Sequence, residues 1–157
     1  MNVWYVNSIL GTFRLEEEND AICGLALCPD GVLELEPLPR KVCETPLLQE
    51  AEEQLNEYFA GARREFDLPL APKGTPFQKA VWAEMCRIPY GETRTYGQLA
   101  AAVGKPKASR AVGGACHCNP IAILQPCHRV VGSTGKLTGY AYGVEMKQYL
   151  LELEKQE

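Results

Sequence analysis

The sequence predicts an α+β protein in two parts, a small sheet-plus-helix domain over residues 1–70 and a mostly helical domain over residues 73–157. Short strand patterns are confined to the first part, whereas helix start and stop signals follow one another in the second. Between them, residues 68–74 contain two prolines and a glycine, which is typical of a linker. The 46% hydrophobic and 23% charged residues are ordinary for a soluble globular protein, and 157 residues suit two small domains.

The first part is expected to begin with a strand over residues 1–10. We interpret this segment as a strand rather than a signal peptide, because no basic stretch precedes its apolar residues. Two further strands, 21–28 and 32–36, flank a Pro-Asp-Gly turn and predict a hairpin. A helix over residues 46–60 follows, since Thr45 suits its N-cap, a proline begins it and a glycine comes directly after it. No run of 18 or more apolar residues occurs, so no membrane-spanning helix is expected.

The second part is expected to hold four helices. The first spans residues 76–87, and the second, over 96–103, begins with a Thr-Tyr-Gly-Gln capping box. A short turn leads to a third helix over 108–118, and the last starts near Val144 with one apolar face. The helices 96–103 and 108–118, joined by a tight turn that contains a glycine, are a candidate helix-turn-helix, although an ordinary packed pair has the same spacing.

Charge is distributed unevenly along the chain. The net charge of −4 is unusual for a nucleic-acid-binding protein. Residues 1–72, however, hold 5 Lys and Arg against 14 Asp and Glu, whereas residues 73–131 hold 8 against 2, a net charge of +6. A basic block within an acidic chain favours an anionic partner for that block, and a solvated basic surface is an equally good explanation.

Seven cysteines are present, and their odd number in a chain large enough to fold without disulfides indicates reduced thiols. We therefore expect a cytoplasmic protein, or a nuclear one if the source is a eukaryote. Most such cysteines are small buried apolar residues. The ligands in Cys116-His117-Cys118 are too close together to close one tetrahedral site, and Cys23 and Cys28 lack a histidine partner, so no bound metal is expected.

Cys127 has the strongest case for chemistry, because one of only two histidines, His128, follows it directly. A thiol with a pKa of about 8.5 is only a few per cent thiolate at neutral pH, and an imidazole that accepts its proton makes it a nucleophile. A carboxylate would then hold the imidazole in the required tautomer. A buried cysteine beside a surface histidine is the alternative, since neighbouring side chains often point apart.

The Pro-Cys-His-Arg-Val segment at 126–130 resembles the active-site motif of the O6-alkylguanine-DNA alkyltransferase (methylated-DNA–protein-cysteine methyltransferase) family. Further segments resemble that family in order and spacing over roughly residues 73–156. They are 96–100, 109–115, Asn119-Pro120, Gly139-Tyr140 and the helix with Lys147 and Glu154. The resemblance implies a ribonuclease H-like N-terminal domain, a winged helix-turn-helix-like C-terminal domain and direct-reversal DNA repair.

The resemblance implies roles in alkyl transfer for four residues. Cys127 would accept the alkyl group, His128 would act as the base through a water molecule, and Glu154 would orient the histidine. Asn119 would support the turn at the active site. The expected reaction is irreversible, stoichiometric transfer of an alkyl group, mainly methyl, from O6-alkylguanine to the thiol, so that each molecule acts once. No cofactor is expected.

The resemblance also implies that the candidate helix-turn-helix binds double-stranded DNA. Arg110 would enter the base stack and fill the space of the flipped-out nucleotide, and Tyr96 would press on the adjacent phosphate. Minor-groove binding suits a protein that reads no sequence, because the code of that groove is degenerate. The other predicted contacts are Lys107, Ala111, Gly113 and Gly114. Helix–helix packing is the alternative reason for the small residues, and we expect the free protein to be a monomer.

The pocket for the flipped base would be lined by Tyr140, Val130 and Lys147, as implied by the resemblance. Two residues depart from common family patterns. Ala141 stands where some members have a hydroxyl residue, which would remove one polar contact to the substrate. Tyr142 stands where some members have glycine, and we hypothesise that its ring narrows the pocket and favours methyl over benzyl adducts.

Three other classes of protein are alternatives to this interpretation. Non-catalytic relatives that only bind lesions replace the acceptor cysteine, which is present here as Cys127. A thiol hydrolase of the Cys-His kind would turn over repeatedly and would leave Arg110 and the basic block unexplained. A helix-turn-helix regulator would usually bind as a dimer to spaced half-sites.

Overall fold

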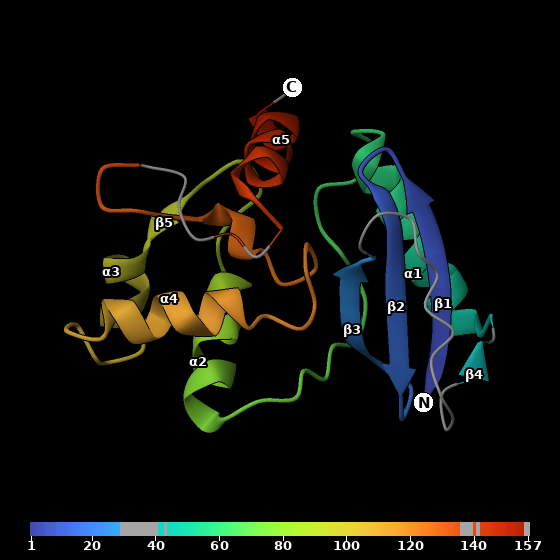
Figure 1. Cartoon of the computed structure of the whole chain (residues 1–157), viewed down its shortest axis with the longest axis horizontal. Coiled ribbons are helices and arrows are strands. Elements are labelled where there is room, and N and C mark those ends of the chain that lie inside the picture. Colours follow the sequence, from blue (N-terminus) through green and yellow to red (C-terminus); the bar gives the residue numbers. More distant parts are fainter. Residues whose placement is uncertain (29–40, 43, 136–139, 141, 156–157) are drawn as a thin grey trace. The chain divides into compact units, whose positions relative to one another are not determined.

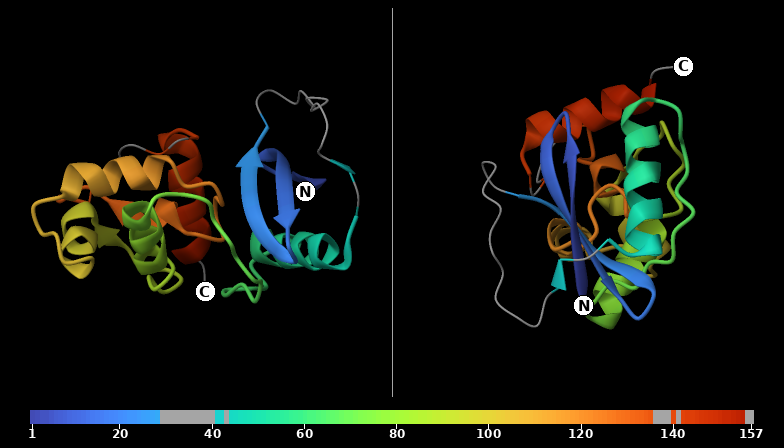
Figure 2. Two further views of the ribbon diagram at one scale, coloured as in Figure 1. Left: turned by 90° about the horizontal axis from the view of Figure 1, so that it is seen from below. Right: turned by 90° about the vertical axis from the view of Figure 1, so that its right-hand side faces the viewer.

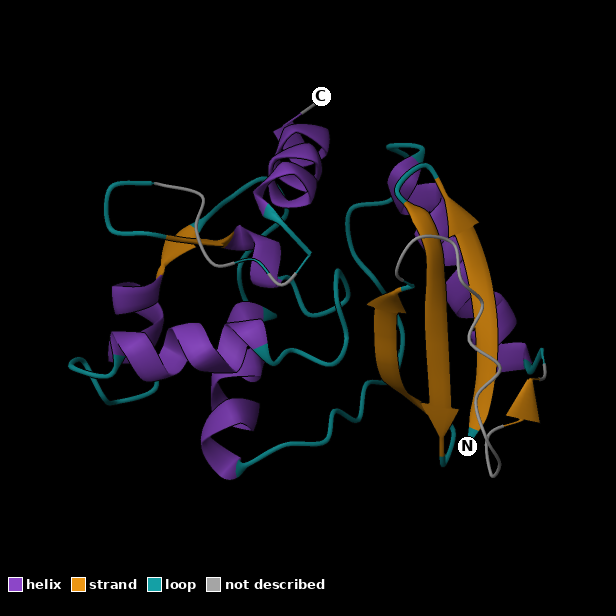
Figure 3. Cartoon of the chain, in the orientation of Figure 1, coloured by secondary structure: helices purple, strands orange, loops and turns teal. Residues whose placement is uncertain are grey.

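The computed structural model describes residues 1–28, 41–42, 44–135, 140 and 142–155, and it confirms a mixed α+β fold (Figure 1). The chain forms two compact units, Met1–Pro72 and Lys73–Glu157. The first unit consists mainly of a sheet with one helix, and the second mainly of helices (Figure 3). No helix among the described residues is both long and apolar enough to cross a membrane.

The first unit is a four-stranded sheet with one helix against it. Its strands lie in the order β3-β2-β1-β4, with β1, β2 and β3 antiparallel and β4 parallel to β1. The helix α1 lies along one face of the sheet (Figure 2). The rings of Phe13 and Phe59 stack between them. The elements are β1 (Asn2–Ser8), β2 (Gly11–Glu18), β3 (Ala21–Leu27), β4 (Lys41–Val42) and α1 (Pro46–Phe59).

The predicted strands at 1–10 and 21–28 and the predicted helix are confirmed, but β2 was not predicted. It pairs with β3 through a tight turn in which Asn19 and Asp20 have positive φ, a conformation that these residue types tolerate. The predicted strand 32–36 and the turn before it lie outside the described residues.

A buried carboxylate ties the sheet to the helix. Glu17 is only 5% exposed; one of its oxygens accepts a hydrogen bond from the Asn2 amide and the other from the Thr45 hydroxyl, both at 3.0 Å. The Thr45 hydroxyl also accepts the Leu48 amide hydrogen and so caps α1, as the sequence predicts. Glu17 is thus a polar residue of the core rather than of the surface.

The second unit begins with three short helices, and the starts of the first two follow the sequence signals. Capping boxes at Thr75 and Thr95 open α2 and α3; the one at Thr95 was predicted, whereas at Thr75 the sequence predicted only a helix start. The indole of Trp82 is buried and donates a hydrogen bond to the Ala115 carbonyl at 2.8 Å, which joins α2 to α4. The elements are α2 (Pro76–Met85), β5 (Arg94–Thr95), α3 (Tyr96–Ala102), α4 (Ser109–His117), η2 (Cys127–Arg129), β6 (Val130–Val131) and α5 (Val144–Lys155).

A two-stranded parallel ladder, which the sequence did not predict, connects the helix-turn-helix region to the Cys127 region. Arg94 of β5 pairs with Val130 of β6, and Thr95 pairs with Val131. Because α3 starts directly after β5 and η2 ends directly before β6, this ladder sets the start of α3 beside the turn that holds Cys127.

Candidate active site and DNA interface

Cys127 follows a buried loop that is braced from inside by Asn119. The Asn119 side-chain oxygen accepts hydrogen bonds from the Ile121 amide at 3.1 Å and from the Gln125 side chain at 2.7 Å, and its amide group donates to the Gln125 carbonyl at 2.8 Å. Ile123 has a φ of 68°, which is a strained conformation for a β-branched residue. The hydrogen bonds of Asn119 hold the loop in this strained conformation and fix the position at which η2 begins.

The thiol of Cys127 is buried, with 6% of the residue exposed. Burial raises its pKa, whereas a hydrogen bond from Asn119, the charge of Lys147 and the neighbouring Tyr140 hydroxyl act in the opposite direction. The thiol is therefore mainly protonated at rest, and a nearby base is required before the sulfur can react.

The next residue along the chain, His128, is the candidate for that base. The Nε2 atom of His128 lies 2.6 Å from Oε2 of Glu154, and both side chains are fully buried. Burial lowers the pKa of His128 although Glu154 opposes this, so the imidazole is neutral near neutral pH. With Nε2–H donating to the carboxylate, Nδ1 is the proton acceptor, and this atom has no hydrogen-bond partner within the described part of the chain.

Glu154 is held in its ionised form. Its burial acts to raise its pKa, but hydrogen bonds from His128 and Arg129 and the charges of these partners outweigh burial and lower the pKa to about 2. The Arg129 Nε and Nη2 atoms donate to the two carboxylate oxygens at 2.7 and 3.0 Å. A third donor, Nη1, bonds the Ile88 carbonyl at 2.8 Å. The carboxylate therefore binds a histidine and an arginine at the same time.

Lys147 is a buried cation on α5. The residue is 1% exposed, and its Nζ lies 5.8 Å from the centroid of the Tyr96 ring. Burial lowers its pKa, and the thiols of Cys127 and Cys116 act in the opposite direction. The structure thus brings Lys147 and Tyr96, which are far apart in sequence, together near the predicted acceptor.

The other predicted pocket residues lie on the segments that follow Cys127. Val130 is fully buried in β6, and Tyr140 is 8% exposed. The rings of Tyr140 and Tyr142 meet edge to face with centroids 5.8 Å apart. Ala141 lies outside the described residues.

Apart from Tyr96, which begins α3, the predicted DNA contacts lie along α4 and the turn before it. Arg110, Lys107, Ala111 and Gly114 are exposed, and Gly113 is half-buried. A Cβ added at Gly114 would meet no atom within 4 Å, and one at Gly113 would meet only the Tyr96 ring at 4.0 Å. Packing within this unit therefore does not require glycine at either position, which argues against the helix-packing explanation.

The cysteines show no metal cluster or disulfide within the described part of the chain. No group of three His, Cys, Asp or Glu residues there is arranged to hold a metal ion. Six cysteines are described, and all six are free thiols. Cys116 is buried, as is Cys127, whereas Cys118 is exposed. The side chains of the Cys-His-Cys run at 116–118 therefore do not gather around one site.

Both parts of the chain match families of known proteins. Residues 76–156 match the family described as "6-O-methylguanine DNA methyltransferase, DNA binding domain", and residues 3–72 match "6-O-methylguanine DNA methyltransferase, ribonuclease-like domain". The chain belongs to the 6-O-methylguanine DNA methyltransferase family.

Individual members of this family are similar over most of the chain. A methylated-DNA–protein-cysteine methyltransferase of Methanosarcina barkeri is 61% identical over 107 residues, 68% of each chain. The constitutive methylated-DNA–protein-cysteine methyltransferase of Bacillus subtilis is 49% identical over 149 residues, 93% of this chain and 90% of the relative. The solved structure of Mycobacterium tuberculosis OGT in complex with DNA has a TM-score of 0.89 at 42% identity, covering 99% of this chain and 93% of that one.

Two residues at this methyltransferase site received no role from the sequence. Arg129 was noted only as part of the motif, although it forms a buried ion pair with Glu154. Gln125 forms the loop bonds with Asn119 described above. Their partners lie 25 and 6 residues away along the chain. The spacing of Gln125 and Asn119 is local enough to suggest a turn, but no sequence signal pairs Arg129 with Glu154.

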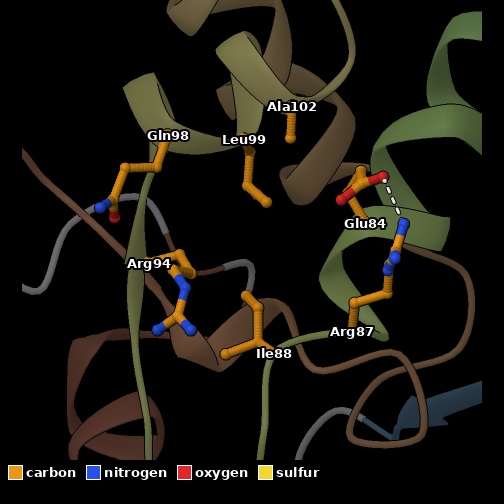
Figure 4. Close-up of a pocket in the computed structure, with 7 residues that line it drawn as sticks. All are labelled: Glu84, Arg87, Ile88, Arg94, Gln98, Leu99 and Ala102. Atoms are coloured by element: carbon orange, nitrogen blue, oxygen red, sulfur yellow. Dashed lines mark hydrogen bonds and ion pairs between the residues drawn. The ribbon is translucent and has the colours of Figure 1, made fainter.

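A separate pocket of about 220 Å³ lies between the end of α2, β5 and α3 (Figure 4). Arg87 and Glu84 form an ion pair at 3.5 Å on one wall, and Arg94 lies on another. The pocket contains none of the predicted catalytic, DNA-binding or base-pocket residues. Its lining is Glu84, Arg87, Ile88, Arg94, Gln98, Leu99 and Ala102.

Proposed function

We propose that this chain repairs alkylated DNA directly, by moving the alkyl group of O6-alkylguanine, mainly methyl, from duplex DNA to its own Cys127. The observation that carries the proposal is the buried relay, in which Cys127 precedes a neutral His128 that bonds Glu154 at 2.6 Å. Membership of the 6-O-methylguanine DNA methyltransferase family supports the same activity. The protein is then a single-use methylated-DNA–protein-cysteine methyltransferase.

The chemistry follows from the roles proposed for the relay. The Cys127 proton passes, directly or through one water molecule, to Nδ1 of His128, whose charge Glu154 stabilises. The thiolate attacks the alkyl carbon, so that a carbon–sulfur bond forms while the bond from that carbon to O6 of guanine breaks. The departing guanine takes a proton on its ring and regains its oxo form. A thioether does not release the alkyl group again, so one molecule removes one lesion.

Base flipping is part of the proposal, because O6 of guanine lies inside the stacked duplex. Arg110, exposed near the start of α4, is proposed to fill the space of the flipped nucleotide, since a long planar cation can both stack and form hydrogen bonds. Tyr96 would press on the adjacent phosphate, and Lys107 would bind the backbone. The backbone of α4 could come close to the minor groove, because Ala111, Gly113 and Gly114 have small side chains or none.

The pocket for the flipped guanine is proposed to lie around Lys147, Tyr140, Val130 and Tyr142, with Ala141 contributing no polar contact. The Tyr142 ring against Tyr140 supports a narrow pocket, which would favour methyl over benzyl groups. Asn119 is proposed as a positioning residue, because its bonds hold the loop that ends at Cys127. The free protein is proposed to be a cytoplasmic monomer that binds DNA without sequence preference.

The direct test is the intact mass of the protein after incubation with excess duplex DNA that contains O6-methylguanine, beside Cys127→Ala. We expect one added methyl group in the parent protein, none in the variant, and never more than one per molecule. Lesion binding without a mass change would instead indicate a non-catalytic lesion binder. Neither binding nor a mass change, with repeated turnover of an ester or peptide substrate, would indicate a thiol hydrolase.

A further inference from the structure

Arg129 occupies a position in the relay that the proposed roles do not yet use. Arg129 is 7% exposed, and its guanidinium contacts three neighbours at once. Two of its donors reach the Glu154 carboxylate and the third reaches the Ile88 carbonyl, while the Tyr90 ring lies 5.7 Å from the guanidinium carbon. With all its hydrogen-bonding nitrogen atoms engaged inside the protein, this arginine is not a DNA contact.

The Glu154 carboxylate is oriented mainly by this arginine. Its Oε1 atom accepts from Arg129 Nε at 2.7 Å and, at a longer 3.4 Å, from the Gly91 amide. Its Oε2 atom accepts from Arg129 Nη2 at 3.0 Å and lies 2.6 Å from His128 Nε2. A bidentate arginine pair fixes the plane of a carboxylate as well as its position. Arg129 therefore determines the direction from which Oε2 meets the imidazole.

The positive charge of Arg129 also offsets the negative charge of Glu154 beside His128. A buried carboxylate alone at 2.6 Å would strongly favour the imidazolium form, which cannot accept the Cys127 proton. Arg129 lies on the same carboxylate and opposes protonation of the imidazole, as does the Lys147 ammonium. The titratable and charged groups around the relay are Glu154 and Lys147 on α5, Cys127 and Arg129 on η2, Cys86 at the end of α2, and Tyr140 before α5.

Resting on the proposed transfer to Cys127, we propose that Arg129 is a positioning residue of the relay. Its bidentate fork, formed by Nε and Nη2, aims the Glu154 carboxylate at His128, and its positive charge adds to the burial that favours a neutral imidazole. Two effects follow, one geometric and one electrostatic. Removing only the fork lowers the transfer rate because the carboxylate is no longer held in plane. Removing the charge raises the pH at which His128 loses its proton.

Two variants separate the effects. Arg129→Lys keeps the charge and loses the fork. Arg129→Gln loses the fork as well as the charge, so the difference between the two variants measures the effect of the charge. The matched control is Arg63→Gln in the first unit, where Arg63 Nε lies 3.0 Å from Glu57. The chain contains only two histidines, so side-chain nuclear magnetic resonance can follow both, and the exposed His117 serves as an internal reference in each sample.

The first measurement is the titration of both histidines in the full-length protein without DNA. We expect the His128 midpoint to rise in Arg129→Gln, because a nearby like charge is lost. It should stay at the parent value in Arg129→Lys and Arg63→Gln, and His117 should be unchanged throughout. A folded Arg129→Gln with an unchanged His128 midpoint overturns the electrostatic effect.

The second measurement is the single-turnover rate of methyl transfer from O6-methylguanine duplex across pH. The rising limb of this profile should move to higher pH in Arg129→Gln, and the plateau should fall about tenfold in Arg129→Lys. If Arg129→Gln does not fold, Arg129→Lys remains decisive, because parent-like transfer in that variant overturns the orienting effect. If the parent protein itself gains no methyl group, the proposed function fails, whereas the histidine titration still reports on Arg129.

Discussion

Gly114→Ala tests why α4 carries small residues on its exposed side. An alanine Cβ at this position would meet no atom within 4 Å, and the residue is exposed, so the substitution causes no clash. Alanine is favoured over glycine inside a helix by about 0.5–1 kcal/mol. We therefore expect the variant to be more stable than the parent, with the unfolding temperature raised by about 1–4 °C.

DNA binding should change in the opposite direction. The minor groove is only about 6 Å wide, so if α4 enters it as proposed, a methyl group at Gly114 would move the helix backbone away from the groove wall. We expect the affinity for duplex DNA to fall about tenfold, which is about 1.4 kcal/mol. Scanning calorimetry gives the stability, and fluorescence anisotropy with a labelled duplex at one fixed salt concentration gives the affinity.

Ala101→Gly on the exposed side of α3 is the matched control, because it makes the reverse exchange at a position not proposed to contact DNA. It should lower the stability by a similar amount and leave the affinity unchanged. A Gly114→Ala protein that is more stable and binds duplex as tightly as the parent would refute close approach of α4 to the groove.

Further predictions address Arg110, the relay and the base pocket. Arg110→Ala should slow repair of duplex DNA while alkylation of Cys127 by a small electrophile keeps its rate; an unchanged duplex rate would show that Arg110 does not fill the stack. Because the pKa of Glu154 is lowered from 4.5 to about 2, it should contribute about 3 kcal/mol to the unfolding free energy above pH 5, and this contribution is lost as the pH falls through 2. Glu154→Gln should remove this acid dependence in denaturant titrations at several pH values, and should also slow transfer; transfer at the parent rate would contradict the relay. Tyr142→Gly should raise the rate for benzylguanine relative to methylguanine, and equal rates for both substrates in the parent would remove the narrow-pocket hypothesis.

Local signals were sufficient to predict the helices and some of the strands. Threonine followed three residues later by glutamine predicted the start of α3, and Thr75 followed by Pro76 predicted the start of α2, because these signals depend only on neighbouring residues. The strand β2 was missed, since Glu16, Glu17 and Glu18 form a charged run. Glu17 nevertheless lies in the core, because Asn2 and Thr45, from other elements, satisfy its oxygen atoms.

The sequence by itself determined the family and the α+β class and singled out Cys127 as the candidate acceptor, because these depend on residue order and on local propensities. Only the tertiary structure decided what surrounds that cysteine. Glu154 bonds His128 across 26 residues and Arg129 across 25, and Lys147 meets the Tyr96 ring only after folding. The ionisation of these groups depends on burial and on charges a few ångströms away, and both are properties of packing in three dimensions.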